Sequence, residues 1–346
     1  MSTSDGVSHG ASRDLPRLTS VRTFAALWVF GFHAYSYAPS RAATPFRTGY
    51  VGVGLFFVLS GFILTWVSVG PVAPGRFYFR RFVRIYPAYL VALVVAAILA
   101  GLPSLPSLAA TVGLLQAWFT TGHLVFGLNP PSWSLSCEAA FYAVFPFVLP
   151  ALRRLSGRRL LLVHATWFGI ATAVVVGLAA HGGLGAKLAY TNPLLRSCEF
   201  GVGILAALLV QRGHRLLPLR AASGLLAALV IVTAIWLPIY PTVDVLLAVP
   251  FALFIAALAW KDLDGARGPL HWPAMILAGQ VSFCFYLVHQ EILRAFARHV
   301  APSLATVLGL LTAAIVAWTL HVGVERPAQR WFTQRWPMRP KPARVD

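Results

Sequence analysis

The chain has 346 residues, of which 58% are hydrophobic and only 11% are charged, and its mean hydropathy is +0.73. An average soluble domain carries about a quarter charged residues, so this chain has too few charges to cover a globular surface. The composition excludes disordered, collagenous and disulfide-scaffold proteins and indicates an all-α, polytopic membrane protein.

The formal net charge is +18, from 28 Lys and Arg against 10 Asp and Glu. Basic residues in short loops between apolar segments set membrane orientation, so we expect the lipid bilayer of the cell membrane as a partner, and no nucleic acid. The three cysteines, Cys137, Cys198 and Cys284, are widely spaced and lie in or beside apolar segments. This pattern predicts no disulfide framework and no metal site. The oligomeric state is left open.

Apolar segments of about 17–25 residues predict about ten transmembrane helices. A further apolar piece, at about 108–120, lies between Pro- and Gly-rich runs and could span, re-enter or lie flat. The ten segments cover residues 18–38, 50–70, 87–103, 137–151, 160–180, 193–211, 219–240, 243–260, 272–293 and 304–324.

The distribution of basic residues predicts the orientation. If the N-terminus is inside and the short piece does not cross, most Lys and Arg residues lie on the inside. We therefore predict that both termini and residues 76–84 face the cytoplasm and that residues 101–136 face out. The expected organisation is a cytoplasmic tail at 1–17, a membrane domain at 18–332, and a basic cytoplasmic tail at 333–346.

The first span contains two ionisable residues, Arg22 and His33, which are expensive in lipid and therefore candidates for a functional site. They are eleven positions apart, which on a helix is about 20° from eclipsed and about 16 Å along the axis. Both side chains therefore share one face, with Arg22 near the cytoplasmic end and His33 in the outer half. The alternative is a snorkelling arginine and a histidine that is hydrogen-bonded within the bundle.

Arginines cluster where the third span begins. Arg81 and Arg84 are three residues apart, and Arg80 and Arg84 are four apart, so one helical turn presents them together. Guanidinium groups bind phosphates through paired hydrogen bonds, which makes this cluster a candidate phosphate site. The alternative is an anchor that only orients the helix.

The outer end of the fourth span carries Trp133, Ser134 and Ser136, which are candidate substrate contacts, and Glu138. Serines before a helix and an acid in its first turn are also typical of an ordinary helix start. A Ser-x-x-Glu capping box would need serine at position 135, which is Leu135, so that device does not explain Glu138.

Three later positions complete the set of candidates. Arg196 and Glu199 are predicted to form a structural ion pair within one helix. His289 lies in the outer half of the ninth span and is a candidate substrate contact. Residues 325–327, Glu-Arg-Pro, are expected to end the last span. Arginines thus gather at the cytoplasmic mouth while His33, Glu138 and His289 lie farther out, which suits a polyphosphate held inside and chemistry deeper in the membrane.

In combination these segments resemble the acyltransferase 3 family of integral membrane acyltransferases. The resemblance covers nearly the whole chain and depends on several motifs in order rather than on any one. They are Arg22 with His33, residues 49–62, 77–87, 133–138 with 141–142, 199–203, 282–289 and 325–327.

The resemblance implies a ten-span enzyme that moves an acyl group, often acetyl, from cytoplasmic acyl-CoA to a hydroxyl of an extracytoplasmic glycan or a natural product. By the same resemblance, His33 is the catalytic base, Arg22 its motif partner, Arg81 and Arg84 the Arg-x-x-Arg pair, and Glu138 a recurrent acid. The sequence departs from the family at two positions. Many relatives have Asp at the position of Gly54 and a second acid at the position of Ala139.

The chemistry agrees with this set of residues. Transfer to an alcohol needs a base such as histidine and a donor for the oxyanion, for which Trp133, Ser134, Ser136 or an arginine are candidates. Ser60 lacks the Gly-x-Ser-x-Gly context of a serine nucleophile, so direct transfer is favoured and an acyl-His33 intermediate stays open. Two alternatives remain: the same chemistry on a secondary metabolite such as a macrolide, or a transporter or flippase without chemistry.

Overall fold

A computed structural model describes residues 14–70, 72–236 and 240–335 of the chain, so most of the two predicted tails lies outside the described residues. Within these ranges every regular element is helical. The longer helices are α1 (Pro16–Tyr37), α2 (Gly52–Val67), α3 (Pro74–Ala100), α6 (Trp133–Arg153), α7 (Gly157–Ala180), α9 (Pro193–Gln211), α10 (Leu219–Trp236), α11 (Tyr240–Leu263), α12 (Pro273–Ala297) and α13 (Pro302–Leu320). The shorter ones are α4 (Leu105–Val112), α5 (Gly122–Val125), α8 (Gly183–Thr191) and α14 (Arg326–Arg335).

The protein is a polytopic helical bundle, as its composition predicted. Eight helical segments of the described residues are long and apolar enough to cross a membrane. The other two predicted spans correspond to α1 and α10. Helix α1 falls below the hydropathy of the eight because it carries polar residues, among them Arg22 and His33, and the apolar part of α10 is shorter. The number of ten spans and the cytoplasmic termini stay predictions.

The segment at 108–120 does not form a spanning helix. It contains most of the eight-residue helix α4 and a 3-10 turn at Gln116–Trp118, and the short helix α5 follows it. At 1.5 Å per residue α4 is about 12 Å long, against about 30 Å of bilayer core. Gly and Pro residues interrupt the chain up to residue 131, and the next long helix, α6, begins at Trp133. The sequence predicted that this span begins at residue 137, four residues later.

The prediction that residues 325–327 end the last span is wrong. Helix α13 passes into a π-helical turn, His321–Glu325, and the chain continues as α14, with Pro327 in the first turn of α14. A π turn shifts the backbone register ahead of the proline, whose ring would otherwise clash with the carbonyl four residues earlier.

Glycines let the central helices approach closely. A Cβ atom at Gly61 of α2 would lie 2.1 Å from the carbonyl oxygen of Phe200 in α9, and one at Gly279 of α12 would lie 1.9 Å from that of Thr19 in α1. Only glycine fits at such contacts, which are typical of helix packing in membranes. The contact at Gly279 sets α12 directly against α1.

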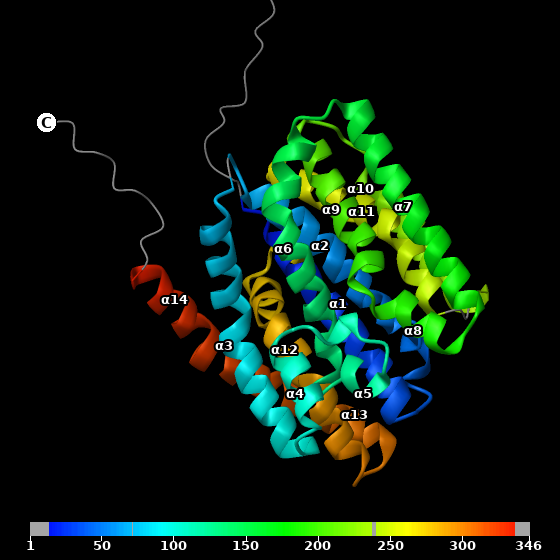
Figure 1. Ribbon diagram of the computed structural model, residues 1–346, viewed down its shortest axis with the longest axis vertical. Helices are drawn as coiled ribbons and strands as arrows, with labels where there is room; N and C mark the ends of the chain where they lie inside the picture. The colour runs from blue at the N-terminus through cyan, green and yellow to red at the C-terminus, as the bar shows by residue number, and fades with distance from the viewer. Residues whose placement is uncertain (1–13, 71, 237–239, 336–346) are drawn as a thin grey trace, which may run out of the picture.

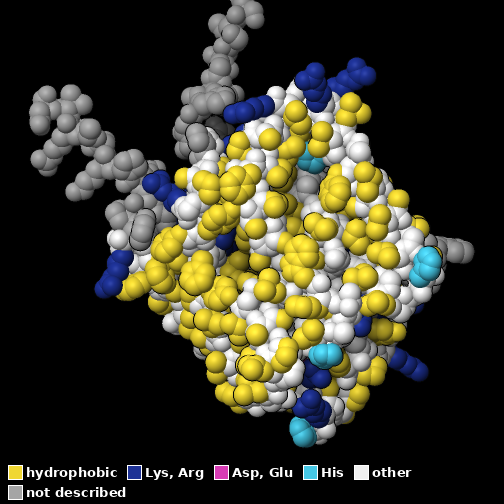
Figure 2. Space-filling view, in the orientation of Figure 1, with side chains coloured by type: hydrophobic (Ala, Val, Ile, Leu, Met, Phe, Trp, Pro, Cys, Tyr) yellow, Lys and Arg dark blue, Asp and Glu magenta, His cyan; other side chains and the backbone are white. Residues whose placement is uncertain are grey.

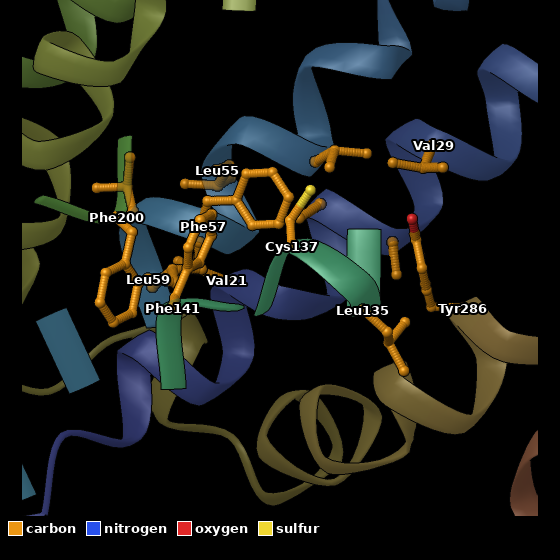
Figure 3. Packing of buried hydrophobic residues seen from close by; sticks show 14 of the residues in the cluster. Val21, Val29, Leu55, Phe57, Leu59, Leu135, Cys137, Phe141, Phe200 and Tyr286 are labelled. Atoms are coloured by element: carbon orange, nitrogen blue, oxygen red, sulfur yellow. The ribbon is translucent and has the colours of Figure 1, made fainter. Parts of the chain in front are cut away.

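Figure 1 shows α1, α2 and α12 in the middle of the bundle, with α7, α10 and α11 on one side and α3 and α14 on the other. The core contains large apolar side chains from several helices, among them Phe57, Phe141 and Phe200, and Tyr286 of α12 approaches the same region from one side (Figure 3). Apolar side chains also cover the middle of the face in Figure 2, while basic side chains gather toward its ends. This is the surface expected of a protein in a bilayer.

Candidate active site

A cavity of about 550 Å³ lies among α1, α2, α3, α6, α12 and the π turn. Its lining is mostly apolar along α2 and uncharged along α12, and its charged residues come from α1, α3, α6, the π turn and α14. The charged lining residues are Arg22, Arg81, Arg84, Arg326, Glu138 and Glu325. Four arginines against two glutamates make the interior of the cavity positive.

Two of these guanidinium groups have no counter-charge in contact. Arg22 of α1 and Arg84 of α3 form no hydrogen bond and no ion pair with the part of the chain that the structure describes. The Arg81 guanidinium packs between the rings of Phe77 and Tyr142, at 5.9 and 6.0 Å from their centroids. Cations held inside a membrane without an acid partner are costly unless an anion is bound, which makes this cavity a candidate anion site.

A second, smaller cavity of about 170 Å³ adjoins the first between α3 and α14. Arg80 lines this one, and Arg81, Arg84 and Gln329 line both. The structure therefore brings together the three arginines that sequence spacing had grouped.

Glu138 lies on the α6 wall of the large cavity. Its carboxylate accepts a hydrogen bond of 2.6 Å from the hydroxyl of Tyr142, one helical turn later, and the same hydroxyl lies 3.3 Å from Ser60 Oγ. Glu138 also interacts electrostatically with Arg22, Arg81 and Arg84 without contacting them. It is thus the carboxylate that faces the arginine cluster.

Tyr286 of α12 and Ser134 of α6 form another wall of the cavity. The Tyr286 hydroxyl lies 2.9 Å from Ser134 Oγ and donates a hydrogen bond of 3.0 Å to the carbonyl oxygen of Pro131. On its other side the Tyr286 ring packs against the ring of His289, with centroids 5.7 Å apart. Tyr286 therefore separates the cavity from His289.

His33 and His289 lie behind this wall and do not line the cavity. They contact each other directly: His33 Nδ1 and His289 Nε2 are 2.8 Å apart. His289 is fully buried and His33 is partly exposed. Spacing along α1 predicted the common face of Arg22 and His33, but it did not predict this partner on α12.

Two further candidates lie outside both cavities. Ser136 is buried, and its hydroxyl accepts a hydrogen bond of 3.3 Å from the backbone N–H of Ala117. Trp133 is buried with its ring 5.8 Å from the Arg196 guanidinium.

Residues 15–322 match the protein family described as "Acyltransferase domain", the acyltransferase 3 family. The chain belongs to this family. It is 35% identical to "Acyltransferase MdmB" of Streptomyces mycarofaciens, with 95% of each chain covered. It is 28% identical to "Exopolysaccharide production protein ExoZ" of Rhizobium meliloti over 85% of this chain and 94% of that protein. It is also 31% identical to "Peptidoglycan O-acetyltransferase OatA" of Listeria monocytogenes, over 46% of this chain and 28% of that protein.

These similarities make the protein a membrane O-acyltransferase. No solved structure matches the fold. The acyltransferase thus has a cavity with a positively charged lining and, behind Tyr286, a histidine pair.

The predicted ion pair of Arg196 with Glu199 is present at 3.1 Å, and sequence reasoning missed its second acid, Asp244 of α11, at 2.9 Å. All three side chains are fully buried. A Cβ atom at Gly54 would lie 3.2 Å from Glu199 and 3.7 Å from Asp244, so two carboxylates lie beside Gly54. Asp244 is a single acidic residue within a predicted apolar span, and that feature of the sequence could have identified it as a partner for a buried cation.

Sequence reasoning also missed the residues around Glu325. Its carboxylate accepts hydrogen bonds from His321 Nδ1 at 2.7 Å, Cys284 Sγ at 3.2 Å and Gln329 Nε2 at 3.1 Å. In the described part of the chain, Cys284, His321 and Glu325 are the one group whose ligand atoms lie close enough to hold a metal. Three protein donors already satisfy this carboxylate, so its geometry has a full explanation as a hydrogen-bonded cluster.

Proposed function

We propose that this acyltransferase moves an acyl group, in the simplest case acetyl, from cytoplasmic acyl-CoA to a hydroxyl of a sugar-containing acceptor. The observation that carries this proposal is the cavity whose arginines lack acid partners. CoA carries its phosphates far from its thioester, and arginine binds phosphate through two parallel hydrogen bonds. Arg81 and Arg84, which line both cavities, are the proposed principal phosphate ligands, with Arg80 and Arg22 beside them.

The distance between the arginines and the histidine pair suits the shape of this donor. Arg22 and His33 are separated by about 16 Å along α1, and the extended arm that joins the phosphates of CoA to its sulfur has a length of that order. For the thioester to reach His33, the arm must pass Tyr286, whose ring closes the cavity. We expect donor binding to displace that ring.

His33 is the proposed general base. It takes the proton of the acceptor hydroxyl as the oxygen attacks the thioester carbonyl carbon. The C–O bond forms, the C–S bond breaks, and the departing thiolate takes up the proton from the His33 imidazolium to give free CoA and a neutral His33. Glu138, held by Tyr142, interacts with Arg22 without contacting it and is proposed to keep the Arg22 guanidinium turned toward the donor.

The proposed acceptor class follows from the names of two relatives, a peptidoglycan O-acetyltransferase and an exopolysaccharide production protein. An acceptor outside the cell would place this enzyme in the plasma membrane. Mass spectrometry of products from wild-type and deletion strains would separate a polysaccharide acceptor from a glycosylated secondary metabolite.

The replacement His33→Gln tests the catalytic proposal. Glutamine keeps a polar side chain but removes the basic nitrogen, so we expect turnover to fall by about 10²–10⁴-fold with little change in acyl-CoA binding. The measurement is transfer of label from radiolabelled acetyl-CoA by purified protein in liposomes, with donor binding measured separately. Near wild-type turnover would show that His33 is not the base. Binding of acetyl-CoA without labelled product from any acceptor, in the wild-type protein, would instead favour a transporter.

A further inference from the structure

The protonation of His289 can be read from its neighbours. Its Nδ1 lies 2.8 Å from the carbonyl oxygen of Tyr286 and 3.2 Å from that of Phe285. A carbonyl oxygen can only accept, so Nδ1 must carry the hydrogen. His289 is fully buried and has no carboxylate in contact. The ring is therefore neutral, and its Nε2 offers a lone pair.

That lone pair determines the state of His33. The two histidines are joined by the 2.8 Å contact between His33 Nδ1 and His289 Nε2. Because His289 Nε2 can only accept, His33 Nδ1 must donate, and the remaining nitrogen of His33, Nε2, is unprotonated in the neutral ring. Nε2 has no hydrogen-bond partner within the described residues, and it is not one of the polar atoms sealed from solvent.

We infer that His289 is a positioning residue that makes His33 Nε2 the basic nitrogen and directs it toward the incoming acceptor hydroxyl. This inference rests on the proposed role of His33. When Nε2 takes the proton of the hydroxyl, the resulting imidazolium keeps its Nδ1–H bond to His289. The chain of hydrogen bonds ends on the backbone carbonyl of Tyr286, so the arrangement needs no charged side chain in the membrane.

The surroundings of the two rings hold this geometry in place. The His289 ring stacks on Phe285, with centroids 5.6 Å apart and 10° between the planes, and the Phe30 ring meets it edge-on at 6.2 Å. The His33 ring stacks on Tyr37 at 6.0 Å. The nearest charged side chains on α12, Glu291 and Arg294, form an ion pair with each other at 3.1 Å. A neutral imidazole thus takes the orienting role that a carboxylate has in a Ser-His-Asp triad.

Two replacements of His289 separate positioning from packing. His289→Phe keeps an aromatic ring to stack on Phe285 but removes the acceptor for His33 Nδ1. His289→Gln loses the ring but can place an amide oxygen where Nε2 was. A hydrogen bond to a charged group is stronger than one between neutral groups, so we expect His289→Phe to lower kcat by about 10- to 100-fold with KM for acetyl-CoA within about twofold. His289→Gln should retain most of the activity.

The opposite order, with His289→Phe active and His289→Gln inactive, would show that the ring only packs and would overturn the inference. Full activity of both variants would overturn it as well. The double variant His33→Gln/His289→Phe adds an independent measurement. If His289 acts through His33, the double variant is no slower than His33→Gln alone. A loss of turnover equal to the product of the two single losses would contradict the inference.

These outcomes also distinguish the inference from the proposed function. An inactive His33→Gln protein together with a fully active His289→Phe protein removes the role of His289 and leaves His33 as the base. An active His33→Gln protein removes the base itself. Thermal unfolding of each variant in detergent confirms that the comparison is made between folded proteins.

Discussion

Two kinds of arginine lie inside this bundle, and they differ in the side chains that they contact. Arg196 is fully buried, contacts two carboxylates, and lies within 5.8 Å of the rings of Phe57, Trp133 and Tyr190. Arg22 and Arg84 line a cavity and contact no carboxylate. An arginine in a membrane is often taken as a mark of function. We propose that the presence or absence of an acid in contact separates a structural arginine from one that binds a ligand.

The largest effect is expected at the structural arginine. Arg196→Met leaves Glu199 and Asp244 as buried carboxylates without a counter-charge, and breaking such a pair costs about 3–5 kcal/mol. We expect a large drop in the thermal midpoint or no folded protein, measured by size-exclusion chromatography and thermal unfolding in detergent.

The triple replacement Arg196→Met, Glu199→Gln and Asp244→Asn is the control, because it removes the whole set of charges. It should restore folding, since uncharged side chains of similar size avoid the desolvation of buried ions. A folded single variant with unchanged stability would show that the two groups of arginines do not differ in the way described above.

A smaller and different effect is expected at the cavity. Arg84→Ala should leave the thermal midpoint unchanged and raise KM for acetyl-CoA by about 10- to 100-fold, because a charge-assisted hydrogen bond contributes about 1.5–3 kcal/mol. The phosphates lie far from the reacting carbonyl, so kcat should change little. Arg84→Lys should restore affinity only in part, because an ammonium cannot form the paired bonds.

Arg76→Ala is the matched control for this measurement. Arg76 lies in the first turn of α3 and carries the same charge at the same end of the helix, but it lines neither cavity. Its replacement should leave KM unchanged. An equal rise in KM for both variants would indicate that α3 attracts the donor only through its total charge.

The smallest effect is expected at a third kind of arginine. Arg215 binds Asp264 at 2.6 Å in the loops that follow α9 and α11, where the two side chains are 59% and 36% exposed. Exposed ion pairs contribute little, so Arg215→Ala should leave both the thermal midpoint at neutral pH and the KM unchanged. A marked loss of stability would mean that pairing matters more than burial.

Acid is expected to remove the stabilisation that this exposed ion pair provides. The hydrogen bond from Arg215 holds the pKa of Asp264 below its ordinary value of about 3.9. The small contribution of this ion pair to the free energy of unfolding is therefore present above the ordinary pKa of Asp and is lost as the pH falls through the lowered pKa of Asp264. Unfolding of wild-type and Arg215→Ala proteins should converge in acid and differ slightly, if at all, near pH 7.

The sequence by itself determined whatever depends on neighbours along one helix. Apolar length identified the membrane bundle, and a period of 3.6 residues grouped Arg81 with Arg84, placed Arg22 and His33 on one face, and paired Arg196 with Glu199. Motif order identified the acyltransferase family, which the comparison over residues 15–322 confirmed. The relations between residues on one helix are local, because the hydrogen bonds of the helix backbone fix how far apart its side chains lie.

The tertiary structure decided which helices face each other. Asp244 reaches Arg196 from another helix, and His289 meets His33 across 256 positions of the chain. Only the close approach of α1 and α12, permitted where Gly279 has no side chain, brings that second pair into contact. The pattern of apolar residues indicates that a helix is buried, but it does not indicate which helix it packs against. Any two apolar faces can exclude lipid or water, and only close packing of their side chains favours one pairing over another. The choice of partner, and with it the separation of the arginine cavity from the histidine pair by Tyr286, came from packing.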